Sequence, residues 1–318
     1  MQSIWSMVLK RIALGFVLVW VVSLVIFAMT QILPGDAAEL RLGQDATPET
    51  VAALRHELGL DQPAIVQYGL WLGRLLTGDL GVSVAGGATI SSLIGYRIGN
   101  TLFMAAVVTV IAVPLSVTIG LLAAMHPGGR IDRFVTSVTL GLVAVPDFLI
   151  ALVLILVVSV HLGWLPAVSY LSGSENIWEA LRALALPILT LITAVASQMI
   201  RMTRAGVLNV MNSPYIEMAI LKGVPRRRII LRHALPNAIG PIVNIIALNL
   251  AYLVGGVVVV ETIFSYPGLA KLMVDGVQNR DMPVVQACAM IFCSTYIVLI
   301  LLSDIASIMS NPRLRFAK

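Results

Sequence analysis

The sequence predicts an all-α membrane protein that crosses the bilayer six times. Its 318 residues are 58% hydrophobic and only 12% charged, whereas a typical soluble domain carries about 25% charged residues. The mean hydropathy of +0.95 agrees with this composition. The chain lacks the polar side chains that cover a water-facing globule. Its composition also excludes a disordered chain, a collagen-like fibre and a disulfide-rich secreted domain.

Six stretches reach the roughly 20 mostly apolar residues that a membrane-crossing helix needs. They are residues 12–33, 100–125, 134–161, 184–201, 239–263 and 284–309. The first is longer than the apolar core of a signal peptide and lacks a small-residue cleavage site, so we expect it to be retained. Four prolines should bend or begin helices, namely Pro114, Pro146, Pro187 and Pro241.

Basic residues predict the orientation of these spans. If both termini lie inside, 14 of the 21 Lys and Arg residues fall in inner segments, and most of the other seven lie among acidic residues. The positive-inside rule therefore places both termini in the cytoplasm. The net charge of +5 is explained by these loops, and we expect no nucleic-acid partner.

The two cysteines are not expected to form a disulfide bond or a metal site. Cys288 and Cys293 are five residues apart in an apolar run, which places them about 140° apart around a helix. Neither belongs to a CxxC pair. We therefore expect no metal and no cofactor in this chain.

The long outer segment, residues 34–99, is predicted to contain two short helices. A capping threonine, a proline and an acid at 47–49 begin the first, which Gly59 ends. Pro63 begins the second, which ends near Gly78. The two helices could form a packed lid over the ends of the spans or a surface that docks a partner.

The chain is predicted to be one domain, residues 1–318. It has no low-complexity linker, no repeat of 20–50 residues and no recognisable symmetry between its halves. The lack of symmetry argues against a secondary transporter built from inverted repeats.

An inner loop, residues 205–236, carries most of the functional information, and we call it the coupling loop. Ser213 and Pro214 read as a helix start, with the serine hydroxyl as cap. Gly223 supplies the left-handed conformation that ends this helix. Pro225 should open a second short helix, which Pro236 should terminate. Two short helices outside the membrane suit insertion into a groove of a partner.

The coupling loop resembles the EAA loop of permease subunits in binding-protein-dependent ABC importers, and the wider chain is most similar to the dipeptide, oligopeptide and nickel group. In the loop, the matching residues are Glu217-Met218-Ala219, Gly223, His233 and Leu235-Pro236. Met218 stands where the loop usually has alanine, and Glu217 and Pro236 follow the general loop pattern rather than the peptide group, which often has arginine there. Elsewhere the matching blocks are Pro34-Gly35-Asp36, Leu58-Gly59-Leu60-Asp61-Gln62-Pro63, Gln67-Tyr68, Trp71-Leu72, Gly78-Asp79-Leu80-Gly81, Gly163-Trp164-Leu165-Pro166, Val260-Glu261-Thr262-Ile263-Phe264, Pro267-Gly268-Leu269, Arg280-Asp281 and Asn311-Pro312-Arg313-Leu314-Arg315.

The resemblance implies a type I importer permease in the bacterial inner membrane, with no catalytic residue of its own. The chain contains no GxxxxGK[ST] phosphate loop, so ATP and Mg²⁺ would be bound by partner subunits. The implied partners are a second homologous permease in a heterodimer, two ABC ATPase subunits and an extracytoplasmic solute-binding protein. The residues expected to couple to the ATPases are Ser213, Tyr215, Glu217, Ala219, Gly223, Arg226, His233, Leu235 and Pro236.

Polar residues inside the spans are candidates for the solute pathway. Asp147 lies about 20 Å along the third span, near mid-bilayer, where an ionised acid costs about 2.5–3.5 kcal/mol unless it meets water or a partner. It could line a pathway or make a structural polar contact. Asn244, Asn249 and Glu261 could also line a pathway, although helix packing is the favoured explanation for the two asparagines and an orienting contact for Glu261. The Gly255-Gly256 pair is expected to allow close helix approach.

The predicted function is that of a permease subunit in an ATP-driven importer of short peptides. Nickel chelates, opines and glutathione are alternative solutes within the same group. A stand-alone secondary transporter would explain six spans and Asp147, but it would not explain the two-helix inner loop. An intramembrane enzyme is disfavoured because the sequence has no HExxH motif and no Ser–His pair at a shared membrane depth.

Overall fold

The computed structural model describes residues 4–32, 42, 47–57, 59–170, 176–225 and 228–310. Within this part of the chain the regular structure is helical, apart from one isolated β-bridge between Val82 and Thr89. The chain divides into two compact units. Unit 1 comprises Met1–Gly15, Phe103–Tyr266 and Val298–Lys318, and unit 2 comprises Phe16–Leu102 and Pro267–Ile297. Each unit is described by itself.

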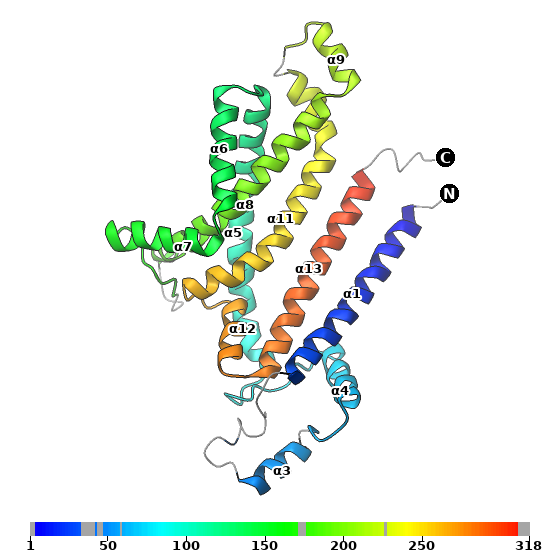
Figure 1. The fold of residues 1–318 in the computed structure, drawn as a ribbon, viewed down its shortest axis with the longest axis vertical. Coiled ribbons are helices and arrows are strands. Elements are labelled where there is room, and N and C mark those ends of the chain that lie inside the picture. The colour runs from blue at the N-terminus through cyan, green and yellow to red at the C-terminus, as the bar shows by residue number, and fades with distance from the viewer. Residues whose placement is uncertain are drawn as a thin grey trace. The chain divides into compact units, whose positions relative to one another are not determined.

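Five helices are each long and apolar enough to cross a membrane, and a bent pair brings the number of spans up to six. The five are α1 (Ile4–Ile32), α5 (Ile90–Met125), α8 (Ile177–Met211), α11 (Leu235–Ile263) and α13 (Met282–Ser310), labelled in Figure 1. This confirms the predicted fold class. Several helices extend beyond the predicted spans, because polar residues in their terminal turns remain helical outside the apolar stretch.

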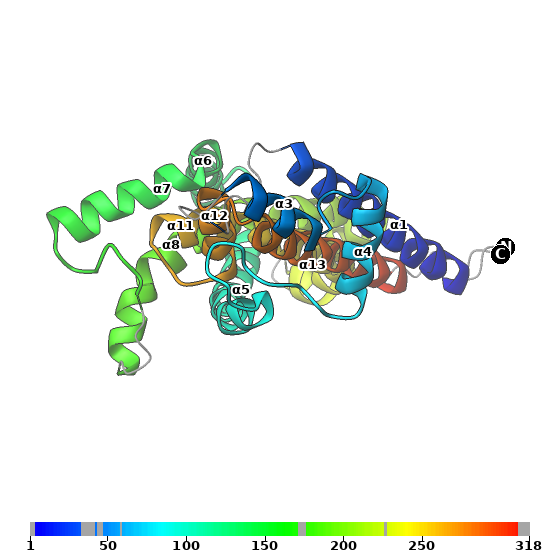
Figure 2. The ribbon, with the colours of Figure 1, turned by 90° about the horizontal axis from the view of Figure 1, so that it is seen from below.

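The third predicted span, 134–161, is not one continuous helix. It consists of α6 (Arg130–Ala144) followed by α7 (Asp147–Leu154) and the π-helical segment η2 (Ile155–His161), and the two parts meet at 100°. Pro146 causes the break, because the residue before a proline is driven out of the helical region. Val145 accordingly adopts φ −94° and ψ 125°, and the carbonyl of Pro146 then starts α7. Figure 2 shows α7 turned away from α6.

In unit 2, both predicted outer helices are present, as α3 (Pro48–Glu57) and α4 (Ala64–Leu76). Gly59 has the expected positive φ of 67°, and Leu58 lies outside the described residues. The α4 helix packs on α1 through Tyr68, whose hydroxyl lies 2.8 Å from that of Ser23 and whose ring meets Phe27 edge-on at 5.5 Å. These contacts favour the lid interpretation of this segment.

Unit 2 also contains a turn that is fixed by a buried carboxylate. Asp281 is 3% exposed, and it accepts hydrogen bonds from the hydroxyl of Ser83 and from the backbone N–H groups of Val84 and Ala85. The neighbouring core joins the start of α5, the short helix α12 (Leu269–Gln278) and the first half of α13 through Ile90, Leu269 and Ala287, among others.

In unit 1, α8 is the most buried of the long helices and packs against α6, α7 and α11. It also approaches α5 closely at Gly120, where an added Cβ atom would lie 2.9 Å from Thr203 Cβ and 3.0 Å from the carbonyl oxygen of Ile200. The predicted glycine pair contributes less. A Cβ atom added at Gly256 would lie at ordinary distances from Leu191 of α8 and Asp147 of α7, at 3.6 and 3.7 Å, and one at Gly255 would meet open space.

An ion pair joins α6 to α8 near the α5–α6 turn. Arg204 donates two hydrogen bonds to Asp132, one of them 2.8 Å long, and the backbone N–H of Gly128 donates a third at 2.7 Å. The side chain of Asp132 is 4% exposed and that of Arg204 is 27% exposed. Since the carboxylate is buried and its bonds are satisfied, the pair fixes the first turn of α6 onto α8.

We predict that Gly120→Ala destabilises the protein by about 1–3 kcal/mol, because the added methyl group overpacks the contact between α5 and α8. The measurement is the thermal unfolding midpoint of the detergent-solubilised protein. Gly141→Ala on α6 is the matched control, because its Cβ atom would meet nothing within 4 Å. If both variants changed the unfolding midpoint equally, the claim that α5 and α8 are tightly packed at Gly120 would be wrong.

We predict that Asp132→Asn destabilises the protein by roughly 3 kcal/mol, because it leaves a partly buried Arg204 without its counter-charge. The control is Asp304→Asn, which removes the partner of Arg11 at 2.8 Å in a much more exposed pair. Such pairs contribute about 1 kcal/mol or less. The two detergent-solubilised variants are compared by heating them and measuring the folded fraction by size-exclusion chromatography. Equal losses of folded protein in the two variants would contradict the prediction.

Candidate functional site

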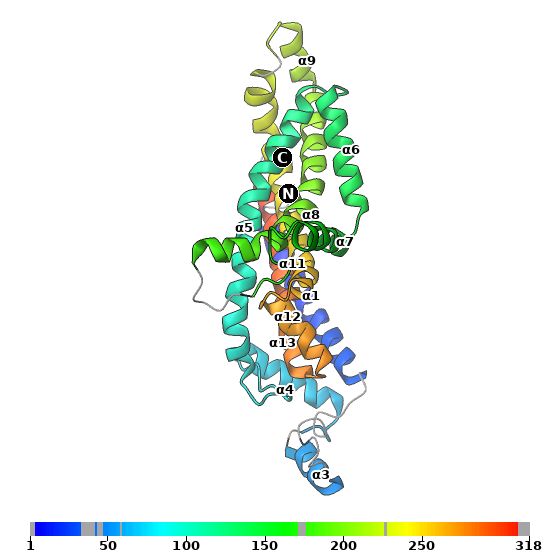
Figure 3. The ribbon, with the colours of Figure 1, turned by 90° about the vertical axis from the view of Figure 1, so that its left-hand side faces the viewer.

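The coupling loop begins later than predicted, because α8 stays helical to Met211. The first loop helix is α9 (Pro214–Leu221), with Ser213 at its N-cap position and Pro214 in its first turn, as expected. The expected side-chain cap is absent at Ser213. Its hydroxyl instead donates to the carbonyl oxygen of Val210 in the last turn of α8, which also accepts from the Ser213 backbone N–H at 3.1 Å. Figure 3 shows α9 beyond the end of the α5–α6 hairpin.

Gly223 ends this helix in the conformation that the sequence predicts. Its φ is +72°, and its N–H donates to the carbonyl oxygen of Ile220 at 2.9 Å. The next N–H, of Val224, donates to Ala219 at 3.2 Å. A Cβ atom at Gly223 would meet nothing within 4 Å, so the requirement for glycine comes from the backbone and not from lack of space.

The second loop helix is described from Arg228 onward, and Pro236 does not terminate it. The carbonyl of Pro225 accepts from Arg228, and the chain continues through the π-helical segment η3 (Ile229–Ala234) directly into α11. Leu235 N–H donates to Ile230, five residues back. A proline in an α-helix removes one hydrogen bond and clashes with the carbonyl four residues earlier, and the wider π turn accommodates both effects.

A small apolar core holds the coupling loop together. Ile216 of α9 is fully buried and packs with Ile229 and Ala234 of η3. Val210, at the end of α8, and Ala219 are among the residues that pack against this core. The loop is therefore a packed unit that is attached to the end of α8 and, through η3, to the start of α11.

The predicted coupling residues divide between the two sides of this unit. Tyr215, Glu217, Gly223, His233 and Pro236 are exposed, whereas Ser213, Ala219 and Leu235 are half-buried. Arg226 lies outside the described residues.

The outward side of α9 exposes large apolar side chains beside Glu217. Tyr215 is 45% exposed, Met218 is 55% exposed and Leu221 is 75% exposed, and Ile220 is exposed beside them. Met218, Ile220 and Leu221 were not among the residues predicted to couple to the ATPases. The signal that could have found them is a run of large apolar residues in a short helix that lies outside the predicted spans. An apolar helix face of this kind can insert into a partner's groove.

The predicted pathway residues make separate contacts. Tyr252 donates a hydrogen bond to Asp147 at 3.1 Å, and Asn244 accepts one from Ser303 at 2.6 Å. Because Asp147 is the first residue of α7, beyond the 100° bend, its depth cannot be counted along a straight helix as predicted. Both contacts favour the structural alternative.

The other two pathway candidates are buried in unit 1. Asn249 donates to the carbonyl oxygen of Ile245 at 2.8 Å, while its own side-chain oxygen has no partner among the described residues. Glu261 is fully buried near the end of α11.

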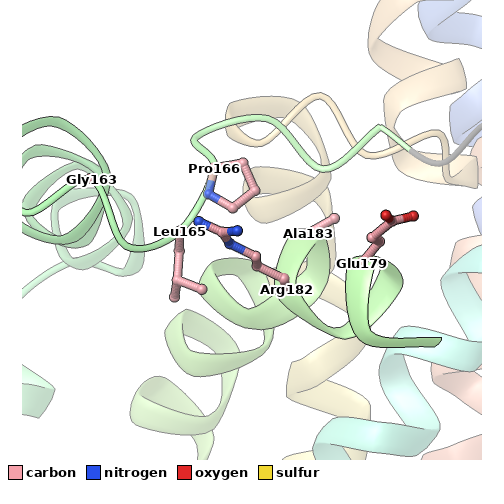
Figure 4. Close-up of a pocket in the computed structure, with 6 residues that line it drawn as sticks. All are labelled: Gly163, Leu165, Pro166, Glu179, Arg182 and Ala183. Atoms are coloured by element: carbon pink, nitrogen blue, oxygen red, sulfur yellow. The ribbon is translucent and has the colours of Figure 1, made fainter. Parts of the chain in front are cut away.

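Two pockets in unit 1 are lined by other residues. The first, of about 340 Å³, is lined by Gly163, Leu165, Pro166, Glu179, Arg182 and Ala183. In Figure 4 the Arg182 side chain reaches from α8 toward the loop at Leu165 and Pro166. Its guanidinium donates twice to the carbonyl oxygen of Trp164, at 2.9 and 3.1 Å. The Gly-Trp-Leu-Pro block thus anchors this loop to the first turns of α8.

The second pocket lies between α6 and α8 and has a volume of about 470 Å³. It is lined by Thr136, Leu140, Val143, Gln198, Arg201, Met202, Arg204 and Ala205. None of the four predicted pathway residues lines either of these two pockets.

Two family models match this chain. The model described as binding-protein-dependent transport system inner membrane component matches residues 116–316, which include the whole coupling loop. The model for the N-terminal part of such membrane components matches residues 4–121.

Curated relatives match over nearly the whole chain. A probable peptide ABC transporter permease protein, y4tP, of Sinorhizobium fredii is 33% identical over 97% of this chain and 99% of its own length. The oligopeptide transport system permease protein AppB of Bacillus subtilis is 34% identical over 97% and 99%. The glutathione transport system permease protein GsiC of Escherichia coli is 36% identical over 97% and 98%. With its membrane-spanning helices and its packed two-helix loop, the chain belongs to the family of inner-membrane permease components of binding-protein-dependent ABC importers.

Proposed function

We propose that the protein is the permease subunit of an importer for short peptides, and that α9 receives the force generated by separate ATP-hydrolysing subunits. The observation that carries this proposal is the division of α9 into two sides. Ile216 attaches one side to the bundle, and the other side exposes Tyr215, Met218 and Leu221. A helix that served only as a connector would not need a large apolar surface facing water.

The packing of the loop suggests how a displacement of α9 reaches the bundle. The core around Ile216 includes the last turn of α8 and the π segment that runs into α11. Because packed apolar contacts transmit displacement with little compression, movement of α9 would move the ends of both helices. These helices also pack on each other along their length. Closure of two ATPase subunits could in this way open or close a path between permease helices.

The proposed assembly contains a second homologous permease, two ABC ATPases and a solute-binding protein on the outer side. ATP and Mg²⁺ would bind to the ATPases. The family description supports dependence on a binding protein. The names of the three relatives support a peptide as the solute.

Both termini are proposed to lie in the cytoplasm with the coupling loop. Arg11 near the start of α1 forms an ion pair with Asp304 near the end of α13, at 2.8 Å, so these two helix ends lie together in unit 1. The excess of Lys and Arg in the corresponding segments supports the cytoplasmic side.

Glutathione is the second candidate solute, and the similarity to GsiC favours it. Glutathione is itself a small peptide with free carboxylates, so the two candidates require similar chemistry from the pathway. Measuring which solute the cognate binding protein retains, by calorimetry with a set of di- and tripeptides and glutathione, would separate them.

We predict that Gly223→Val uncouples ATP hydrolysis from transport. A side chain at φ +72° costs about 1–2 kcal/mol, and a β-branched one is the least tolerated, so the end of α9 should shift. Peptide uptake into proteoliposomes should fall roughly tenfold if that cost applies to the productive state. The complex should still assemble and hydrolyse ATP.

The matched control is Gly223→Asn, because asparagine tolerates the left-handed conformation and should retain most of the uptake. Gly73→Val, at an exposed helical glycine with open space around it, should leave uptake unchanged. Normal peptide-stimulated uptake by Gly223→Val would refute the coupling assignment.

A further inference from the structure

The second pocket, which we call the α6–α8 groove, combines charged and polar side chains of α6 and of the C-terminal half of α8, two helices that belong to candidate membrane spans. Along α6 it is lined by Thr136, Leu140 and Val143, which share one face of the helix. Along α8 it is lined by Gln198, Arg201 and Met202, and then by Arg204 and Ala205.

The two arginines in this groove differ in their partners. Arg204 is neutralised by Asp132. Arg201 lies one turn further into α8, its side chain is exposed, and no acidic residue in the described part of unit 1 forms an ion pair with it. The groove therefore offers a cation whose hydrogen-bonding capacity is open to a ligand.

The order of polar side chains along α8 indicates whether water or lipid fills the groove. Gln198 lies one turn beyond Arg201, further from the α5–α6 turn, and it is also exposed. If a lipid occupied the groove with its headgroup on Arg201, its acyl chain would lie against the amide of Gln198, which would lose its hydrogen bonds. Charged side chains in membrane segments almost always face a water-filled cavity or a partner. The observed order therefore favours water.

We infer that the α6–α8 groove is a water-filled section of the solute path and that Arg201 binds a carboxylate of the passing solute. This inference rests on the proposed function. Every peptide with a free C-terminus carries a carboxylate, and a guanidinium binds carboxylates in a bidentate manner. The volume of about 470 Å³ is in the range of small-molecule sites. Because Arg204 is neutralised by Asp132, Arg201 would hold the solute in this open groove by one cation, and the solute can leave it again, as transport requires.

The first test measures water access at position 201 and needs no solute. In the assembled complex, with Cys288→Ser and Cys293→Ser as background, the variant Arg201→Cys is treated in inside-out vesicles with a charged methanethiosulfonate reagent. We expect it to react at least about tenfold faster than Val138→Cys, because only a hydrated thiol ionises readily. Val138 is exposed on a different face of α6 from the groove.

Equal reaction rates with the charged reagent, combined with labelling of both variants by a membrane-soluble maleimide, would overturn the inference and would indicate that lipid fills the groove. Retention of the charged-reagent reaction would support a water-filled groove even if the solute were not a peptide.

The second test concerns the carboxylate. We expect Arg201→Gln to lower the maximal uptake of trialanine into proteoliposomes severalfold, while assembly, the thermal unfolding midpoint and binding of trialanine by the solute-binding protein stay unchanged. Arg201→Lys should restore most of the uptake, because it keeps the charge and loses only the bidentate geometry. A merely structural role for Arg201 would lower the unfolding midpoint together with uptake.

Unchanged trialanine uptake by Arg201→Gln would overturn the carboxylate role. If the wild-type complex with its ATPases and binding protein took up neither trialanine nor glutathione, the proposed function would fail. The labelling result would still decide whether the groove holds water, so the two failures are distinguishable.

Discussion

The packing of α8 is the constraint on which the rest of unit 1 depends. In a bilayer there is little hydrophobic driving force between helices, so association relies on close packing and polar contacts. At α8 these are the approach of Gly120 to Thr203, and the ion pair between Asp132 and Arg204. Because α8 also runs without interruption toward the coupling loop, the contacts that fix the bundle also fix the position of the loop.

The coupling loop then depends on a second, smaller core and on a local departure from α-helical geometry. Ile216 and Ile229 bury the inner side of the loop, which leaves the outer side of α9 free for a partner. The π turn of η3 allows the helix to pass Pro236 without a break. A helical connection into α11 is stiffer than an irregular linker would be, and stiffness is required of an element that transmits displacement.

The sequence predicted the parts of this structure that depend on local pattern. Apolar length identified the long helices, and Gly223 and Pro214 marked the ends of α9, because backbone preference alone decides such positions. It could not predict features that depend on neighbouring helices. Three such features are the angle between helices at Pro146, the acceptor of the Ser213 hydroxyl and the helical path through Pro236. In each case the local sequence is compatible with several conformations, and tertiary packing selects one of them. Similarly, glycine spacing did not reveal that Gly120, rather than Gly255, faces another helix.

The polar residues of the spans show why residue type alone does not identify a solute path. Asp147 and Asn244 are the kinds of side chain that a pathway would use, yet they bond to Tyr252 and Ser303 and so join helices within the bundle. A side chain whose hydrogen bonds are taken up by a neighbouring helix can bind a solute only after that contact breaks, which adds a cost to every transport cycle. Arg201 and Gln198 line open space and carry no such cost. A solute path must bind its solute weakly and release it. A side chain at a cavity surface whose hydrogen bonds are still available is therefore a stronger indicator of such a path than the charge of a residue or its depth in the membrane.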